Sequence, residues 1–512
     1  MKTTFLLTNV FLFIQIGLFA QETNQDSILF NTKNLITTKA VLPFSNHGFV
    51  KIKSDNLEDP SILEMEAYNL KNELLYKQTL STKRENEWFA IEGTFVWDNS
   101  LVVLASLYHP GPQKNHLLLY QYSLPNLELV HSKILLKSFA PTETRIPFLH
   151  KLSPNKSQLV ISSWSFRGEK ENGKIELVIY DKDFNKIDNR KKVLPFENRR
   201  IFQEEVLIDN QGNCYYIGNN YEGNLFTELR PILMKKFILA FYATEKTDSL
   251  YRFPKSKINY EQTQFTINSK QELVGLTLSK IGTRVNFEGT VLTSIKPSTK
   301  IFSTYVQKIE KEQFKTAFAK NNPNLATPKY SFSSAYSLKQ TFAHEDNYYL
   351  VGEKYELKGN YFDPTEGLTE KYELQDIFVI KLNTGGVFQW MSRIPKKQEL
   401  GGQLLSFFSF KAFARKNHLL FLFNDSYDNL SEVSLRKTAK ATYKNAKLVI
   451  TQLALEDGTF KRRQLQALIG KKYLTQTEYS YKINENELFF YANGRAVGAK
   501  KSIVKTLKLK PE

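Results

Sequence analysis

The sequence predicts an all-β protein made of repeated four-stranded units, and three observations support that fold class. Short apolar runs separated by polar turns follow one another along most of the 512 residues, which is the pattern of paired antiparallel strands. Phe (38) and Tyr (26) far outnumber Met (4), and aromatic side chains favour strands. Pairs of these runs recur at a regular spacing, which indicates an internal repeat.

The repeat is clearest where two distant segments have the same order of parts. Residues 376–397 (DIFVIKLNTGGVFQWMSRIPKK) and residues 175–196 (IELVIYDKDFNKIDNRKKVLPF) each contain an apolar run, a polar turn, a second run and a proline. Similar hairpins begin at Ile62, His116, Lys236, Gly289 and Lys447. A second hairpin, with Asn or Asp in its turn, lies upstream of these, so one unit has four strands, a to d.

We expect eight such units, with seven as the alternative count. They begin near Ala40, Gly93, Pro147, Gln203, Thr263, Leu338, Leu404 and Thr477. The last unit has three strands, of which SIVKTLKLK at 502–510 is the third. Near the other end of the chain, DSILFNTKN at 26–34 has the pattern of a strand that belongs to no unit.

This organisation resembles the β-propeller superfamily in general, and the resemblance implies that the strand at 26–34 completes the last blade and closes the ring. WD-repeat signatures are absent. LNTGGVFQW at 382–390 is similar to the glycine–tryptophan docking motif of pyrroloquinoline-quinone propellers, but other units lack the Trp, as in EDGTFKRR at 456–463. We therefore expect Trp390 to be a core aromatic residue, and we expect no quinone or other cofactor.

The N-terminus predicts a secretion signal over residues 1–20. Lys2 precedes an apolar segment that ends at Ala20, as in a signal peptide. The alternative is an N-terminal membrane anchor, but the segment is short and polar residues interrupt it. The expected plan is then an N-terminal segment at 21–38 with the ring-closing strand, and a single propeller domain at 39–512. The mature chain is expected in the periplasm or the cell exterior, soluble or peripheral, without a transmembrane span.

Charge and cysteine content constrain the partners and the core. The formal net charge is +18, which would attract acidic glycans, anionic lipid headgroups or free DNA outside the cytoplasm; the alternative is a solvated basic surface with no specific partner. Cys214 is the only cysteine, so no internal disulfide can form, and its strand-like surroundings predict a buried apolar role.

The long connections predict a working face. The a–b and c–d turns are short, whereas the b–c and d–a connections, which share one face of each unit, are long at 165–173, 218–234, 310–329, 353–375 and 425–446. Elaborated loops on one face often bind ligands, although loop drift is the alternative. The candidate binding residues are Tyr221, Phe226, Tyr361, Phe362, Tyr372, Arg436, Lys437, Lys440 and Lys444. Alternatively, the acidic insert of the sixth unit and the basic insert of the seventh neutralise each other, and the aromatics hold the loops to the scaffold.

No local motif predicts catalysis or metal binding. The seven histidines lack metal-ligand spacing, and no nucleophile elbow, phosphate loop or dinucleotide fingerprint occurs. The basic triplets RKK at 190–192 and KRR at 461–463 fall in d strands, where charge protects exposed sheet edges, and no nucleic-acid partner is expected. The sequence favours an exported, non-catalytic module that binds an envelope protein or an anionic polysaccharide. A propeller enzyme, a polysaccharide lyase or hydrolase with its site at the channel mouth, is the alternative.

Overall fold

The computed structural model describes most of the chain, in two compact units. The described residues are 37–44, 48–55, 60, 62–82, 87–140, 146–222, 225, 232–254, 260, 262–280, 287–310, 336–363, 367–401, 407–429, 439–442, 445–494 and 502–509. The first unit is Met1–Asn69, Glu73–Lys255 and Lys296–Ile301, and the second is Leu70–Asn72, Ser256–Ile295 and Phe302–Glu512. The predicted signal peptide at 1–20 and the predicted closing strand at 26–34 lie outside the described residues.

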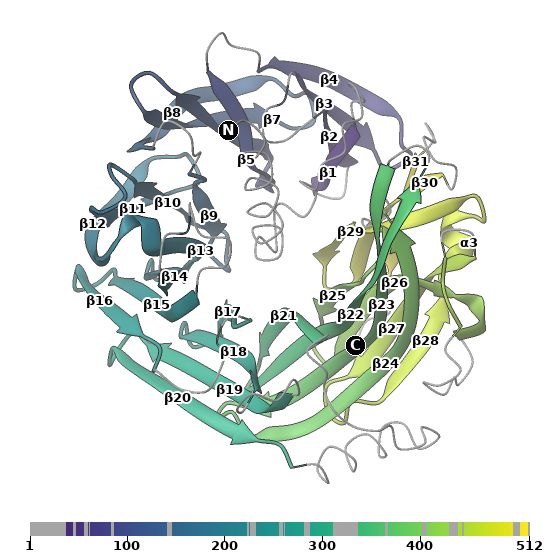
Figure 1. Cartoon of the computed structure of the whole chain (residues 1–512). Coiled ribbons are helices and arrows are strands. Elements are labelled where there is room, and N and C mark those ends of the chain that lie inside the picture. The colour runs from purple at the N-terminus through teal and green to yellow at the C-terminus, as the bar shows by residue number, and fades with distance from the viewer. Residues whose placement is uncertain are drawn as a thin grey trace. The chain divides into compact units, whose positions relative to one another are not determined.

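The first unit contains four sheets of four strands, and in each sheet neighbouring strands are consecutive in the sequence (Figure 1). The sheets comprise β1 (Thr37–Phe44), β2 (Gly48–Ser54), β3 (Ile62–Asn69) and β4 (Leu74–Ser81); β5 (Trp88–Trp97), β6 (Ser100–His109), β7 (Lys114–Ser123) and β8 (Leu129–Phe139); β9 (Leu149–Leu152), β10 (Leu159–Ser165), β11 (Asn172–Tyr180) and β12 (Lys186–Glu197); and β13 (Ile201–Ile208), β14 (Cys214–Glu222), β15 (Ile232–Tyr242) and β16 (Thr247–Arg252). A 3-10 turn, η1 (Asn198–Arg200), precedes β13.

The second unit has three more four-stranded sheets and one described sheet of three strands. They comprise β17 (Gln264–Ile267), β18 (Leu273–Lys280), β19 (Phe287–Lys296) and β20 (Ile301–Lys308); β21 (Tyr336–His344), β22 (Asn347–Asp363), β23 (Gly367–Asn383) and β24 (Phe388–Gly401); β25 (Lys411–Ala414), β26 (His418–Ser426), β27 (Ala446–Ala454) and β28 (Phe460–Gln464); and β29 (Tyr473–Asn484), β30 (Glu487–Gly494) and β31 (Ser502–Lys508). Short helical turns occur at η3 (Tyr427–Asn429) and α3 (Gln466–Ile469). The predicted all-β class and the eight units are confirmed, and the described part of the last unit has three strands.

The polar turns form because an Asp or Asn side chain replaces backbone hydrogen bonds at the bend. Asp181, Asp209, Asn268 and Asn383 each accept hydrogen bonds from the backbone N–H groups two and four residues later, at 2.8 to 3.0 Å. This local bond is the reason that Asp and Asn are favoured in turns. The hairpin turns predicted from these residues are confirmed.

Apolar side chains from adjacent sheets form the cores within each unit. One core of the first unit joins Ile175 and Leu177 of β11 to Tyr216 of β14 and Phe237 of β15. Another in the second unit joins Val379 of β23 to residues of β26 and β27. Inner strands are therefore buried on both faces, which explains their continuous apolar runs. The outermost strand β4, by contrast, is exposed along most of its length.

Two single-residue predictions are confirmed, and one predicted loop is wrong. Cys214 and Trp390 are buried, at 1% and 8% exposure, and the Trp390 Nε1–H donates to the carbonyl of Glu456 at 2.9 Å. The predicted connection at 353–375 instead extends β22 and β23 into a paired ribbon, with Tyr355 opposite Leu374 and Asp363 opposite Gly367. The charged residues of this segment are typical of a loop. Antiparallel strands pair through their backbone groups, however, and can carry charged side chains on a face that meets water.

Within the described ranges, no helix has both the length and the apolar character that crossing a membrane requires.

Candidate functional site

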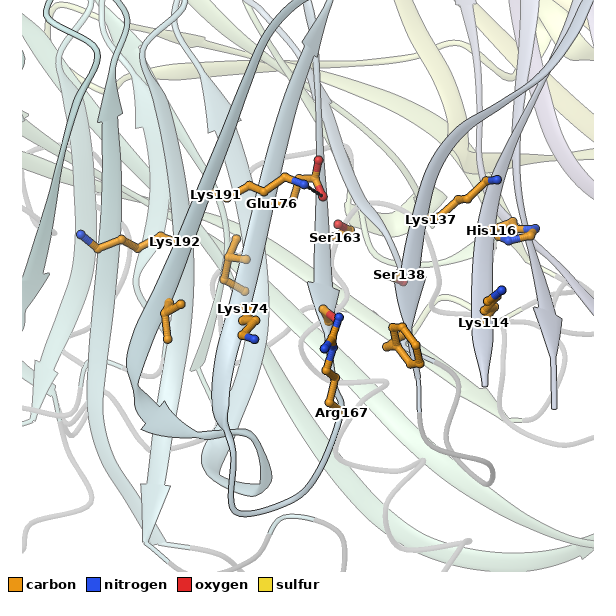
Figure 2. Close-up of a pocket in the computed structure, with 14 residues that line it drawn as sticks. Lys114, His116, Lys137, Ser138, Ser163, Arg167, Lys174, Glu176, Lys191 and Lys192 are labelled. Atoms are coloured by element: carbon orange, nitrogen blue, oxygen red, sulfur yellow. Dashed lines mark ion pairs between the residues drawn. The ribbon is translucent and has the colours of Figure 1, made fainter. Parts of the chain in front are cut away.

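A pocket of about 500 Å³ lies between the second and third sheets of the first unit. Its walls come from β7 and β8 on one side and from β10, β11 and β12 on the other (Figure 2). Six of its fourteen lining residues are cationic, and Glu176 is the single carboxylate among them. The cationic residues are Lys114, Lys137, Arg167, Lys174, Lys191 and Lys192.

Strand periodicity explains how residues of different segments reach one pocket. Side chains two positions apart share a face of a strand, and the lining includes such pairs: Lys114 and His116 in β7, Ser163 and Ser165 in β10, and Lys174 and Glu176 in β11. All of these lie near the ends of strands that meet the b–c and d–a connections. The small hydroxyl side chains of β10 leave room between the two sheets, and the basic side chains surround that room.

Four of the six cationic groups in the pocket have no carboxylate partner among the described residues. Lys191 pairs with Glu176 at 3.3 Å, and Lys192 pairs with Asp248 at 2.5 Å. Among the residues that the structure describes, Lys114, Lys137, Arg167 and Lys174 form no ion pair; the Arg167 guanidinium lies over the Phe139 ring, 4.9 Å from its centroid. Unpaired positive charges of this density attract an anion and hold it against a partly apolar wall.

One histidine of the pocket belongs to a short chain of polar contacts. His116 Nδ1 lies 3.3 Å from Nε2 of His109, and His109 Nδ1 lies 2.7 Å from Oε1 of Glu87. Burial lowers the pKa of His116, and His109, Lys137 and Lys114 lower it further. His116 is therefore a neutral imidazole at neutral pH, among cations that would each gain from a bound anion.

The described residues among those predicted to bind from the long connections do not line the pocket. Tyr221 is half-buried near the end of β14. In β22, the backbones of Tyr361 and Phe362 pair with Thr369 and Leu368. Residues outside the described ranges are Phe226, Arg436, Lys437 and Lys444.

Two of the predicted residues make contacts within the second unit. The Tyr372 ring stacks on Tyr355 with 5.1 Å between centroids, and both pack against a core that contains Phe407 and Phe408. Lys440 forms an ion pair with Glu399. The stacking of Tyr372 agrees with the alternative in which the aromatics hold the connection to its scaffold. Glu399 lies in β24, outside the acidic insert at 353–375, so the ion pair of Lys440 does not join the two charged inserts.

Sequence reasoning found part of the pocket and missed its centre. The connection at 165–173, identified as long, supplies Ser165 and Arg167. The triplet RKK, interpreted as edge protection, supplies Lys191 and Lys192. Nothing in the sequence indicated Lys114 and Lys137, because a single lysine near the end of a strand has the same sequence pattern whether it faces solvent or a neighbouring sheet.

The triplet KRR at 461–463 also differs from the exposed, charged sheet edge that the sequence predicted. Its strand, β28, is an outer strand as predicted, but the side chain of Arg462 is only 7% exposed and lies 3.6 Å from Asp425. Nearby, Lys396 and Glu353 form a fully buried ion pair, and the Ser409 hydroxyl donates to Glu353 at 2.7 Å. These groups are tightly packed, so we assign them a structural role. Within the described part of the chain, no cluster of His, Cys, Asp or Glu could hold a metal ion.

The architecture follows from the repeat. The structure has eight successive sheets, and each is a meander of consecutive strands. Adjacent sheets inside each unit are joined by apolar cores. The chain is an eight-bladed β-propeller. Its sheets are the blades, and the pocket lies between blades two and three.

Comparison with known proteins gives only distant likenesses. No protein-family model matches the propeller, and no curated protein matches it. It is similar to the WD40 domain of SCAP from fission yeast, with 8% identity, 89% of this chain and 94% of that chain covered, and a TM-score of 0.33. It is also similar to the β-propeller domain of the Trilobed protease from Pyrococcus furiosus, with 10% identity, 84% and 97% covered, and a TM-score of 0.35. A variant of Synechocystis apocarotenoid oxygenase gives 10% identity, 97% and 96% covered, and a TM-score of 0.34.

Proposed function

We propose that this propeller is an exported, non-catalytic interaction module of the cell envelope or exterior that binds an anionic glycan in the pocket between blades two and three. The observation that supports the proposal is the concentration of six cationic side chains around a space of about 500 Å³. Pockets of this size accommodate small ligands or one segment of a larger chain. Export rests on the signal peptide expected at 1–20, and residues 39–512 would form a single propeller domain.

An anionic glycan fits the lining better than a simple inorganic ion does. Cations lie on both walls, from Lys114 and Lys137 on blade two to Arg167 and Lys174 on blade three, so successive carboxylate or sulfate groups could each meet a positive charge. Ser138, Ser163 and Ser165 supply hydroxyl groups for the sugar hydroxyls. The carbons of Phe139 and Ile175 offer apolar surface to the faces of the sugar rings.

The test compares binding of polygalacturonate, dextran sulfate and neutral dextran at 0.15 M salt. The variant Lys114→Ser/Lys137→Ser/Lys174→Ser removes three unpaired cations of the pocket. We expect its affinity for the two polyanions to fall by about tenfold or more, because each exposed ion pair contributes up to about 1 kcal/mol. The matched control Lys416→Ser/Lys471→Ser/Lys472→Ser removes three exposed lysines of the second unit and should bind like the wild type.

Two results would contradict this proposal. Equal losses in both triple variants would mean that the overall positive charge attracts the glycan and that the pocket has no special role. Equal binding of neutral dextran would remove the electrostatic basis altogether.

A second candidate is an enzyme that acts on the same glycan, a polysaccharide lyase or hydrolase. The contacts that join Glu87, His109 and His116 favour it, because a carboxylate-oriented imidazole is a common general base. Prolonged incubation with polygalacturonate distinguishes the candidates: new reducing ends or unsaturated uronates support the enzyme, and an unchanged polymer supports the binding module.

A further inference from the structure

The contacts of Glu87, His109 and His116, here called the histidine relay, connect the pocket to a carboxylate that does not line it. A carboxylate can only accept a hydrogen bond, so the His109 Nδ1–H donates to Glu87, 2.7 Å away. The other nitrogen of His109 faces His116 Nδ1 at 3.3 Å. His116 lines the pocket, and because its Nδ1 is used in the relay, its Nε2 is the nitrogen available to a ligand.

The number of protons in the relay determines what that nitrogen offers. When both imidazoles are neutral, His109 Nε2 carries no proton and accepts from His116 Nδ1–H, so His116 Nε2 is an acceptor. When one proton is added to His109, its Nε2–H donates to His116 Nδ1, and the proton of His116 moves to Nε2. One added proton therefore changes the nitrogen at the pocket from an acceptor into a donor.

The charges around the relay determine where the added proton is best held. Lys114 of β7 and Lys137 of β8 lie near His116 and oppose a positive charge on it. Across the pocket, Arg167, Lys174, Lys191 and Lys192 add positive charge, and Glu176 is already paired with Lys191. His109 has the Glu87 carboxylate beside it, which stabilises an imidazolium there. A positive charge on the relay is thus best placed on His109.

We propose that an anion entering the pocket is bound together with one proton, that Glu87 and His109 hold this proton outside the pocket, and that His116 Nε2–H then donates to the anion. The inference rests on the proposed binding function and adds two positioning residues and a pH dependence to it. The balance is simple, because one proton leaves the solvent and is held by the relay. Affinity should rise as the pH falls from 8 to 6, by at most about tenfold per pH unit for one proton.

The experiment measures the proton directly. Dextran sulfate is the probe, because its sulfate esters stay ionised over this pH range and only the protein titrates. Calorimetric titrations at pH 6.5 in two buffers of different ionisation heat give the number of protons taken up. We expect a net uptake of protons, at most one per pocket, for the wild type, and the same uptake for His131→Gln, which changes an exposed histidine of β8 outside the pocket.

Two relay variants should show how much of the affinity depends on the bound proton. His109→Gln should abolish the proton uptake and the rise in affinity at low pH, because Gln cannot take up the proton that the relay holds. Glu87→Gln should move the uptake to lower pH, because the carboxylate that stabilises the imidazolium is gone. The wild-type titration tests the inference even if one variant fails to fold.

The outcomes separate the two proposals. If wild-type binding is lost in the pocket triple variant but no proton is taken up, the pocket binds anions and the relay inference is overturned. Uptake that persists in His109→Gln also overturns it. If dextran sulfate does not bind, or binds independently of Lys114, Lys137 and Lys174, the proposed function itself fails.

Discussion

Arg462 shows how burial changes the role of a single side chain. It lies on the outer strand β28, yet its guanidinium packs over the rings of Phe423 and Phe460, at 5.7 and 5.6 Å from their centroids. It also donates to the carbonyl of Asn429 at 3.0 Å. Burial raises the pKa of its partner Asp425 to about 6, even though Arg462 acts in the opposite direction. The positive charge of Arg462 therefore stabilises the ionised form of Asp425.

Arg462→Met should destabilise the protein by about 3 to 5 kcal/mol at pH 8, the usual cost of removing one partner of a buried ion pair. The cost should be smaller at pH 5. Below the folded-state pKa of about 6, Asp425 is protonated in the wild type as well, so little attraction is lost. Above it, the wild type has an ionised Asp425 beside Arg462, whereas the variant must bury an unpaired charge or keep a proton. Urea unfolding at the two pH values measures the difference.

Arg463→Met is the matched control, because Arg463 is the exposed neighbour on the same strand. It should change the free energy of unfolding by less than about 0.5 kcal/mol, as is usual at exposed positions. If the two variants have the same free energy of unfolding, or if the destabilisation by Arg462→Met does not grow with pH, the ion pair of Arg462 and Asp425 does not stabilise blade seven.

At the scale of the element, the ribbon formed by β22 and β23 is the clearest feature that distinguishes one blade from the others. Its base is held by the stack of Tyr355 on Tyr372 and by their packing on Phe407 and Phe408. Strand β24 extends alongside it, with Gln375 opposite Lys397 and Lys371 opposite Gly401. The ribbon is thus a continuation of blade six.

Tyr372→Ala should lower the free energy of unfolding by about 1 to 3 kcal/mol, because it removes both an aromatic pair and part of a core contact. Tyr372→Phe keeps the ring and should be close to the wild type. Thermal or urea unfolding of the two variants checks this. A Tyr372→Ala protein of unchanged stability that no longer bound polyanions would instead support the binding role expected for Tyr372 from the sequence.

The elements that the sequence predicted are those with a local cause. Asp181 and Asn268 form their turns through hydrogen bonds to residues two and four positions away, so a short segment contains the whole signal. The pocket has no such signal, since Lys114, Lys137 and Lys174 come from three strands of two blades. The ribbon was missed because its charged composition resembles that of a loop. The burial of Arg462 was missed because alternation along β28 does not reveal which face meets Asp425.

At the scale of the whole molecule, a net charge of +18 gives every polyanion a general attraction to this propeller. Screening separates that attraction from the pocket, since the Debye length shortens from about 30 Å at 0.01 M salt to about 8 Å at 0.15 M. Distant lysines then stop contributing, whereas the clustered cations still act together.

We therefore expect the wild type and the pocket triple variant to bind dextran sulfate with similar affinity at 0.01 M salt. At 0.15 M salt the wild type should retain measurably tighter binding than the variant. A salt titration of both proteins by fluorescence anisotropy of labelled dextran sulfate tests this. If the affinities of the two proteins fall in parallel over the whole range of salt concentration, the pocket adds nothing to the attraction that the overall positive charge produces.

The meander order of the blades has a consequence for how the chain acquires its structure. Each sheet uses only consecutive strands, so its backbone pairing needs no segment that has not yet been made. The cores between sheets, such as the one joining Leu177 to Tyr216, need only the next blade along the chain. A polypeptide with such short-range contacts can fold vectorially, blade after blade, as it emerges from a ribosome or a translocation channel. The newest blade is then the one with an uncovered apolar face, and the arrival of the following blade buries it.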